Sequence, residues 1–268
     1  MPIQCDYHMH TPLCHHADGP MEAYVERAIE LGLREVGFSD HNPLPNGFGA
    51  NVRMKESELE YYVNRVLDLR FQYHGKIDVM LGLELDYVEG LEDYVAKQIA
   101  AYPWDYIIGS VHYLDRDCRI GSWSKNYPGT ADEQYARYFA LIRQLANSGL
   151  CDVLAHLDVV KRCTHLPTQR GLDEISATLA EIARAGVCME INTSGYRHPE
   201  LVNDPQPYPA LPVVEQAVAL GIPLTVNSDA HAPDQVGLKF AAIESFLLKC
   251  GCRQLARFDR RKREFYAL

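Results

Sequence analysis

The sequence lacks the long apolar run that a membrane-spanning helix needs. No stretch approaches about 18 consecutive apolar residues, and the first ten residues, MPIQCDYHMH, contain neither the basic segment nor the apolar segment of a secretory signal. We therefore expect a cytoplasmic protein that has no membrane partner.

Positive charge is also scarce. The chain of 268 residues carries 26 Lys and Arg against 36 Asp and Glu, a formal net charge of -10. Proteins that bind nucleic acid mainly through phosphate contacts need a basic surface, so no nucleic-acid partner is expected. Any anionic ligand must be held by a local positive site.

Cysteine motifs are sparse, although the chain has eight cysteines. There is no CxxC pair, and the only close pair is Cys250 and Cys252. Neither a zinc ribbon nor a dense disulfide framework is indicated, and we expect mostly buried, reduced thiols.

Several common catalytic motifs are missing. The sequence has no GxSxG, GxxxxGK[ST], GxGxxG or HExxH, so it gives no support to a serine hydrolase, a P-loop enzyme or a dinucleotide-binding enzyme. Cys14 in TPLCHH has neighbouring histidines, but adjacency in sequence does not establish the geometry of a nucleophilic thiol, and we disfavour that interpretation.

Short apolar segments rich in β-branched residues alternate with segments of helical period. The expected strands are Ile3 to His10, Glu35 to Asp40, Asp78 to Asp86, Asp105 to His112, Asp152 to His156, Val187 to Asn192 and Ile222 to Asp229. The expected helices are Pro20 to Leu31, Glu56 to His74, Gly90 to Ala100, Ala131 to Ser148, Leu172 to Ala185, Pro209 to Leu220 and Gln235 to Lys249. Seven strand–helix units without a flexible linker predict one α/β domain over residues 1–268, a seven-stranded barrel. An open doubly wound sheet is the alternative.

Two segments stand apart from this alternation. The stretch from His198 to Pro212 carries five prolines and predicts an irregular loop, which we expect to cap a site. From about Arg253 the tail carries six basic residues against two acidic ones. We expect it to be a solvated face, with anion binding or subunit contact as alternatives. The oligomeric state stays open.

Histidines and carboxylates gather at the carboxyl ends of the expected strands. This group comprises His8, His10, His41, Glu84, His112, His156, Asp229 and His231. In β/α barrels that rim carries the active site. Any one of these residues alone is more often a hydrogen-bonded core histidine or a solvated carboxylate, but their coincidence on one rim predicts a shared site.

Pairs of these residues have the spacing of metal ligands. His8 and His10 are two residues apart on a strand, so their side chains leave the same face, about 6.5 Å apart at Cα. Asp229 and His231 repeat the spacing, and Glu84 is available to bridge two ions. An imidazole-rich shell suits Zn, Fe or Mn, whereas the few carboxylates fit an all-oxygen Mg or Ca site poorly.

These motifs resemble, in order and from Cys5 to His231, those of the polymerase-and-histidinol-phosphatase (PHP) superfamily of metal-dependent phosphoesterases. The matching segments are DYHMHTPLCHHA, GFSDH, GLELDY, GSVH, LAHLD and NSDAH. The resemblance implies a distorted seven-stranded β/α barrel with three divalent metal ions at the carboxyl-end rim. It implies that the first ion is held by His8, His10, Glu84 and Asp229, the second by Glu84, His112 and His156, and the third by His16, His41 and His231. His16 is preferred to His15 because the family's ligand comes six residues after the second histidine of HxH.

Within the superfamily the chain is most similar to the histidinol-phosphate phosphatase branch, through TPLCHHA, GFSDHNPLP, GSVHYLD and EINTSGYR. The resemblance implies hydrolysis of a small phosphorylated substrate, L-histidinol phosphate, in histidine biosynthesis. We expect a hydroxide that bridges two of the ions to attack phosphorus. The residues themselves indicate only a metal-dependent hydrolase.

Cations near the same rim are candidates for holding the phosphate. Arg197 follows the strand ending in NTSG, and Lys161 and Arg162 follow LAHLD. The general acid is either Asp229, His231 or a metal-bound water.

Three other functions remain open. An amidohydrolase-type barrel also has HxH after its first strand, but His231 after Asp229 and Glu84 in the bridging position disfavour it. A metal-stabilised binding subunit without activity is disfavoured by the complete ligand set. A phosphatase or phosphodiesterase of the same fold that acts on nucleotides or other small phosphates is the main alternative, since fold does not determine substrate.

Overall fold

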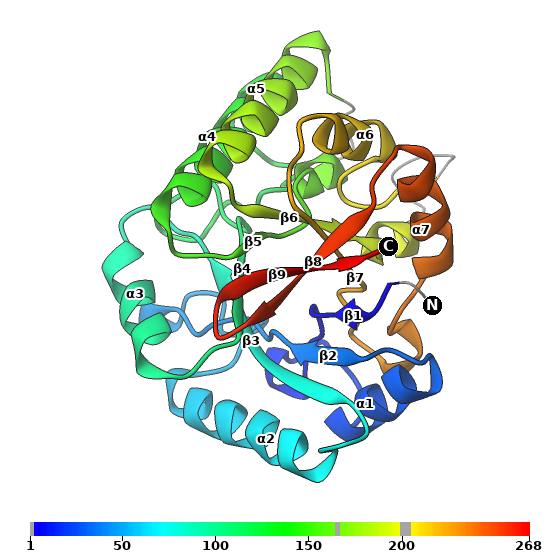
Figure 1. Ribbon diagram of the computed structural model, residues 1–268. Coiled ribbons are helices and arrows are strands. Elements are labelled where there is room, and N and C mark those ends of the chain that lie inside the picture. The colour runs from blue at the N-terminus through cyan, green and yellow to red at the C-terminus, as the bar shows by residue number, and fades with distance from the viewer. Residues whose placement is uncertain (1–2, 164–166, 199–204) are drawn as a thin grey trace.

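Seven parallel strands form the centre of the protein (Figure 1). A computed structural model describes residues 3–163, 167–198 and 205–268. The strands pair in chain order, and they are β1 (Cys5–Asp6), β2 (Glu35–Phe38), β3 (Asp78–Asp86), β4 (Tyr106–Ser110), β5 (Val153–Leu154), β6 (Cys188–Asn192) and β7 (Leu224–Asn227). The order never reverses, which excludes the doubly wound alternative.

The first and last strands approach each other and nearly close the sheet into a barrel. Beyond β1 and β7, Met9 and Ala230 form an isolated parallel bridge. Ala230 N donates to His8 O at 2.9–3.0 Å, as His10 N does to Ala230 O. The expected seven-stranded α/β barrel is therefore confirmed.

Helices surround the strands (Figure 1). The α-helices are α1 (Met21–Glu30), α2 (Leu59–Gln72), α3 (Glu92–Ala101), α4 (Ala131–Ser148), α5 (Gln169–Ala185), α6 (Leu211–Ala219) and α7 (Phe240–Lys249). Short 3-10 helices are η1 (Pro12–Cys14), η2 (Pro45–Gly47), η3 (Glu56–Glu58), η4 (Val159–Cys163), η5 (Thr193–Arg197) and η7 (Pro233–Gln235). Within the described ranges no helix is both long and apolar enough to cross a membrane.

Local sequence explains where the elements begin and end. Helix α4 has the predicted bounds because Thr130 and Glu133 form a capping box at its start and Gly149 takes a left-handed conformation at its end. Helix α7 begins later than predicted, because η7 and the left-handed Lys239 precede it. Several strands end before the predicted residues, because the rim histidines leave the hydrogen-bonded ladder.

A buried tyrosine crosses the barrel interior below the rim. The Tyr106 hydroxyl lies 2.6 Å from Tyr7 O and 3.1 Å from Phe38 O, so it donates to backbone carbonyls just after β1 and at the end of β2. A Cβ atom on Gly37 or Gly82 would lie 2.2–2.3 Å from the Tyr106 phenol. Glycine is therefore required at both positions to make room for the ring.

The expected solvated C-terminal face is the outward side of an ordered structure. Residues from Gln254 onward form an antiparallel hairpin of β8 (Gln254–Asp259) and β9 (Lys262–Ala267). Phe258 packs inside the barrel with residues of β1, β4, β5 and β6. Arg261 binds Asp152, which directly precedes β5, so the hairpin covers the amino-terminal mouth.

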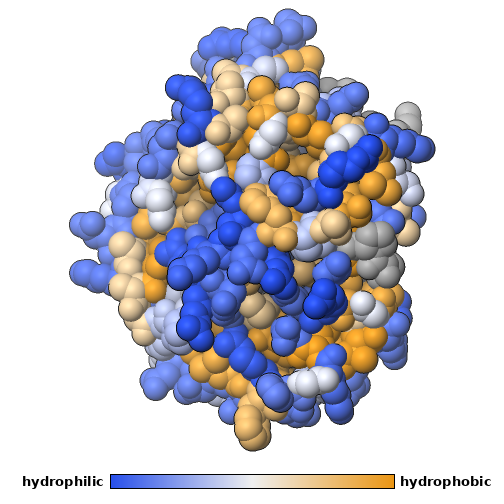
Figure 2. Space-filling model, viewed as in Figure 1, coloured by the Kyte–Doolittle hydropathy of each residue, from blue (hydrophilic) through white to orange (hydrophobic). Residues whose placement is uncertain are grey.

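The outward side of the hairpin is polar. Figure 2, in the same view, shows hydrophilic residues gathered over the centre of this face. Exposed charged residues of the hairpin include Arg260, Lys262 and Glu264. Leu255, Ala256 and Phe258 form the buried inward side of the hairpin, whereas most of its charged residues, and Phe265, are exposed. The many exposed charges explain why the composition resembles that of a solvated tail.

Candidate metal centre

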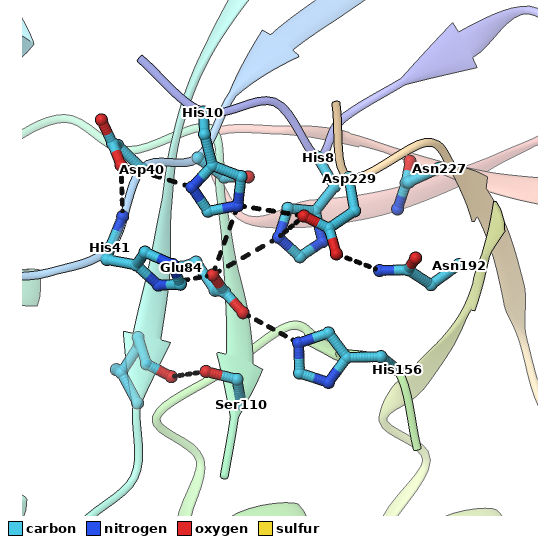
Figure 3. A network of polar contacts seen from close by, with 12 residues as sticks. His8, His10, Asp40, His41, Glu84, Ser110, His156, Asn192, Asn227 and Asp229 are labelled. Carbon is cyan, nitrogen blue, oxygen red and sulfur yellow. Dashed lines mark hydrogen bonds and ion pairs between the residues drawn. The ribbon is translucent and has the colours of Figure 1, made fainter. Parts of the chain in front are cut away.

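Glu84 lies at the centre of the carboxyl-end rim. It is the seventh residue of β3, and it is 1% exposed. Its carboxylate oxygens lie between 2.8 and 3.6 Å from ring nitrogens of five imidazoles, those of His8, His10, His41, His112 and His156. Figure 3 shows the side chains of His8, His10, His41 and His156 converging on Glu84 from different parts of the rim. A carboxylate so placed is suited to bridging two ions, as the sequence predicts.

Asp229 approaches the same cluster from the end of β7. Its Oδ1 lies 3.2 Å from His10 Nε2 and 3.8 Å from His8 Nε2. Its Oδ2 accepts hydrogen bonds from Asn192 Nδ2 and Ser194 Oγ, both at 3.1 Å. The residue has φ 52, a conformation that non-glycine residues rarely adopt. Backbone strain of this kind is typical of residues held for function.

The turn after β1 brings His16 to the cluster. Helix η1 ends at Cys14, and the residue that follows it, His15, has φ 65 and donates its N–H to Pro12 O. The turn returns the chain so that the His16 ring lies 4.7 Å from that of His231 and 5.6 Å from that of His41. The structure thus brings together all nine side chains predicted as metal ligands, including His16, which was preferred to its neighbour His15.

Buried acceptors orient many of these imidazoles through Nδ1. His8 Nδ1 lies 2.7 Å from Glu190 Oε1, and His112 Nδ1 lies 2.9 Å from Asp86 Oδ1. His10 Nδ1 lies 3.3 Å from Asp40 Oδ1. Holding Nδ1 fixes the tautomer and directs Nε2 toward the centre, which is how proteins prepare histidines for metals.

These three acidic residues were not predicted. Asp40 and Asp86 lie in the GFSDH and GLELDY motifs, next to or two residues from a predicted ligand. Glu190 sits on β6 with no neighbouring ligand in sequence, yet it is fully buried. The detectable signal is a carboxylate in an apolar strand, which needs a partner because an unpaired buried charge is costly.

The inner atoms of the cluster lack hydrogen-bond partners. Within the described part of the chain, His8 Nε2, His10 Nε2, His41 Nδ1 and Glu84 Oε2 are buried and unpaired. His41 Nδ1 and Glu84 Oε2 lie only 2.8 Å apart without the angles of a hydrogen bond. Buried polar atoms rarely stay unsatisfied in proteins. Imidazole nitrogens and carboxylate oxygens that converge in this way fit divalent transition-metal ions.

The electrostatics of Glu84 and His41 favour the protonation states of metal ligands. At His8, His10 and His112 burial lowers the pKa, but neighbouring carboxylates outweigh burial and raise the pKa while no metal is bound. Burial raises the pKa of Glu84, but the imidazoles of His41, His112 and His8 outweigh it and hold the pKa well below its usual range. Burial lowers the pKa of His41 to about 4, with His10 adding to the effect against the opposing charge of Glu84. The carboxylate is ionised and the His41 ring neutral near neutral pH, as metal ligands must be.

The two side chains proposed as general acid have similar properties. Burial raises the pKa of Asp229, but His8, His10 and His231 hold it well below its usual range. Burial and the positive charge of His10 lower the pKa of His231. Both shifts favour the deprotonated forms, which are the forms that bind metal.

A cavity of about 440 Å³ opens above the cluster. Arg162 and Arg197 line it together with Trp123 and Tyr208. The Arg197 guanidinium donates to Asp229 O at 2.7 Å and to Ser228 O at 3.3 Å, and the Arg162 guanidinium lies 4.9 Å from the Trp123 ring centroid. These two predicted phosphate-binding cations therefore face the site.

Lys161 is placed differently from its neighbour Arg162. Its Nζ donates to Asp158 Oδ2 at 3.0 Å and to Pro207 O at 2.9 Å, and it lies 4.7 Å from the Tyr208 ring centroid. It is not among the residues that line the cavity. Lys161 stabilises a surrounding loop, and the structure gives no support to its predicted contact with substrate. Part of the predicted capping loop, residues 199–204, lies outside the described residues.

Comparisons with known proteins agree with this geometry. The PHP domain family model matches residues 6–194. A Deinococcus radiodurans protein described as "Probable histidinol-phosphatase" is 38% identical over 247 residues, which cover 88% of this chain and 90% of the relative. The Bacillus subtilis histidinol-phosphatase is 29% identical, with 91% of this chain and 98% of the relative covered.

A solved structure shares the fold over nearly the whole length. It is the crystal structure of histidinol phosphate phosphatase from Lactococcus lactis subsp. lactis complexed with zinc, L-histidinol and phosphate. It superposes with a TM-score of 0.81 at 21% identity and covers 98% of this chain and 99% of its own. With the family model, the extended sequence identity and the converging ligand set in agreement, the chain belongs to the PHP domain family.

Proposed function

We propose that the chain is a metal-dependent phosphomonoesterase that hydrolyses L-histidinol phosphate to L-histidinol and phosphate, a reaction of histidine biosynthesis. The observation that carries the proposal is the convergence of Glu84, Asp229 and the rim imidazoles beneath a cavity lined by two arginines. The names of the Deinococcus radiodurans and Bacillus subtilis relatives support this substrate. So does the ligand set of the Lactococcus lactis structure, which includes both reaction products.

Three divalent ions fit the donor set. His8, His10, Glu84 and Asp229 would hold the first, Glu84, His112 and His156 the second, and His16, His41 and His231 the third. When bound, such ions supply positive charge for the phosphoryl oxygens and lower the pKa of water, which makes it a nucleophile at neutral pH. Zinc, iron and manganese all accept this mixture of imidazole and carboxylate.

The arginines bind and orient the phosphate. The Arg197 guanidinium is half-buried, and two of its N–H groups are held by the backbone carbonyls of Ser228 and Asp229. That anchoring fixes the plane of the guanidinium at the edge of the cavity, where the other donors can bind phosphate oxygens. Arg162, held over Trp123, faces the same space. Two fixed cations compensate locally for the negative net charge.

The cavity wall supplies apolar surface for the organic half of the substrate. Val52, Trp123, Val159 and Tyr208 line it beside the arginines. Aromatic faces bind both imidazole rings and ammonium groups, the two features of histidinol.

Phosphate release tests the proposal directly. Metal-reconstituted protein and a matched chelated sample would be given L-histidinol phosphate, nucleoside monophosphates, a phosphodiester and sugar phosphates. We expect metal-dependent turnover with a large preference for L-histidinol phosphate. Equal turnover of the panel would retain the phosphoesterase and refute the biosynthetic substrate. No metal-dependent turnover of any compound would refute the enzymatic proposal.

A pair of arginine variants tests the phosphate-binding role. We expect Arg197→Ala to lose most turnover while its metal content matches that of the wild type. Arg116→Ala removes an arginine that is 69% exposed and pairs with Glu89, and it serves as the control. Unchanged kinetics in Arg197→Ala would remove the residue from the proposed binding site.

A further inference from the structure

Cys14 lies within the imidazole cluster. Its side chain is fully buried, and its sulfur forms a group with ligand nitrogens of His16 and His231 in which all three atoms lie within 4.8 Å of one another. A second such group joins Cys14 to His10 and Asp40. Ligand atoms around one zinc ion lie about 3.3–3.8 Å apart, given bond lengths of about 2.0–2.3 Å. If the three atoms moved about 1 Å closer to one another, they would have the spacing of ligands around one ion.

The turn after β1 fixes the thiol in this place. Thr11 caps η1 through Leu13 N, and its hydroxyl donates to the Asp40 carboxylate. Cys14 N donates to Thr11 O at 3.0 Å, and Cys14 O lies 2.7 Å from His16 Nδ1. The same residue thus orients the His16 ring through its carbonyl and places its sulfur beside that ring. The anchored turn therefore fixes the backbone of Cys14 beside the imidazoles.

An independent observation marks the same place as a ligand site. His10 Nε2 and His41 Nδ1 are buried and have no hydrogen-bond partner, although each residue is otherwise well anchored. A ligand nitrogen from each of His10 and His41 forms a further group with one from His231, again within 4.8 Å. This group and the group containing Cys14 share His231. The unsatisfied nitrogens and the buried sulfur therefore each belong to a group that includes a ligand nitrogen of His231.

We infer that Cys14 is a sulfur ligand of the third metal ion, beside His16 and His231. The inference rests on the proposed function, which requires that ion. On binding, the thiol releases its proton to solvent and the thiolate sulfur donates to the metal. Thiolate is a soft ligand, so its presence favours zinc or iron at this position over magnesium or calcium. Cys14 thereby acquires a role as ligand that its position in TPLCHH alone does not reveal.

Cobalt substitution tests the inference without relying on turnover. Co²⁺ would be titrated into metal-free wild type, Cys14→Ser and Cys250→Ser. A thiolate bound to Co²⁺ gives an intense charge-transfer absorption in the near ultraviolet, whereas imidazole and carboxylate ligands give only weaker visible bands. We expect the intense band in the wild type and in Cys250→Ser, and its loss in Cys14→Ser. We also expect one Zn²⁺ to bind Cys14→Ser at least about 10-fold more weakly than the wild type. Even a change in a residue that only orients a metal ligand lowers metal affinity by about 10-fold or more.

The outcomes separate this inference from the proposed function. If wild type binds three Co²⁺ ions and hydrolyses L-histidinol phosphate without the intense band, Cys14 is not a ligand and the proposed function stands. An intense band that persists in Cys14→Ser overturns the inference in the same way. If the wild type binds no Co²⁺ and has no metal-dependent turnover, the proposed function itself fails. Circular dichroism of each variant shows whether loss of the band reflects unfolding.

Discussion

Replacing Glu190 by glutamine should weaken metal binding while leaving the barrel folded. The Glu190 carboxylate accepts four contacts: His8 Nδ1 at 2.7 Å and Asn227 Nδ2 at 3.0 Å on one oxygen, and His156 N at 3.0 Å and Asn192 Nδ2 at 2.9 Å on the other. Glutamine has the same shape but only one acceptor oxygen. Whichever way the amide turns, its NH₂ group meets two donors, so two hydrogen bonds are lost and the His8 ring is no longer held by a charge.

The size of the effect follows from the place of Glu190 behind a ligand. Changing the group that orients a metal-binding histidine costs about 10- to 100-fold in metal affinity. That range corresponds to roughly 1.4–2.7 kcal/mol. We expect the cost in Glu190→Gln to lie within it, because the residue contacts the ring of one predicted ligand and the backbone of another, His8 and His156.

A competition titration with a chromophoric chelator measures this affinity for each ion. Glu35→Gln is the matched control, since Glu35 is also a buried carboxylate at a barrel strand, but it pairs with Tyr7 and Arg257 at the opposite mouth. Glu35→Gln should retain the wild-type metal affinity. Equal affinities in wild type and Glu190→Gln, with all ions bound, would refute the argument that Glu190 prepares His8 for metal.

Three further predictions concern the barrel interior. Gly82→Ala places a Cβ atom 2.2 Å from the Tyr106 ring and should lower the free energy of unfolding, measured by urea denaturation, by about 1–3 kcal/mol. The loss should be smaller in a Tyr106→Ala background. An equal loss in that background would contradict the steric argument. Phe258→Ala should lower the free energy of unfolding by about 3–5 kcal/mol in the same assay, because it leaves a cavity under the hairpin. A loss below about 1 kcal/mol would show that the hairpin is not part of the core. Burial raises the pKa of the Cys188 thiol to about 12, so the native state keeps a proton that the unfolded chain loses above about pH 8.5. The stability of the wild type should therefore fall as pH rises above that value, and Cys188→Ala should reduce the decline by about 1.4 kcal/mol per pH unit; parallel pH profiles would argue against the shift.

The sequence alone predicts the part of the site that lies at the strand ends. Every strand end predicted to carry a ligand places that side chain in the cluster, because the hydrophobic pattern locates the strands and parallel strands share one carboxyl-end rim. The choice of His16 over His15 required the family resemblance. In the structure, a left-handed turn at His15 brings the next residue, His16, to the cluster.

Features that depend on distant contacts were not predictable. Glu190 is separated by 182 positions from His8, and a single carboxylate in a strand does not indicate its partner. The direction of Lys161 depends on Pro207 and Tyr208, which fold back from a later part of the chain. The hairpin was missed because its arginines dominate the composition, while only its inward residues, such as Leu255 and Phe258, report burial.

Because the hairpin comes last in the chain, the barrel can be closed at its amino-terminal mouth only at the end of synthesis. All seven barrel strands precede β8 and β9 in the chain, so they leave the ribosome first. Until the hairpin follows, the apolar residues beneath it, including Tyr7 and Ile108, face an open mouth. An unfinished chain of this kind exposes surface that chaperones bind and other chains adhere to. The side chain of Arg261 binds Asp152, and its backbone N–H donates to Asp105 O. These contacts hold the hairpin over the mouth, so they form only after the whole chain has been made and then cover the apolar residues.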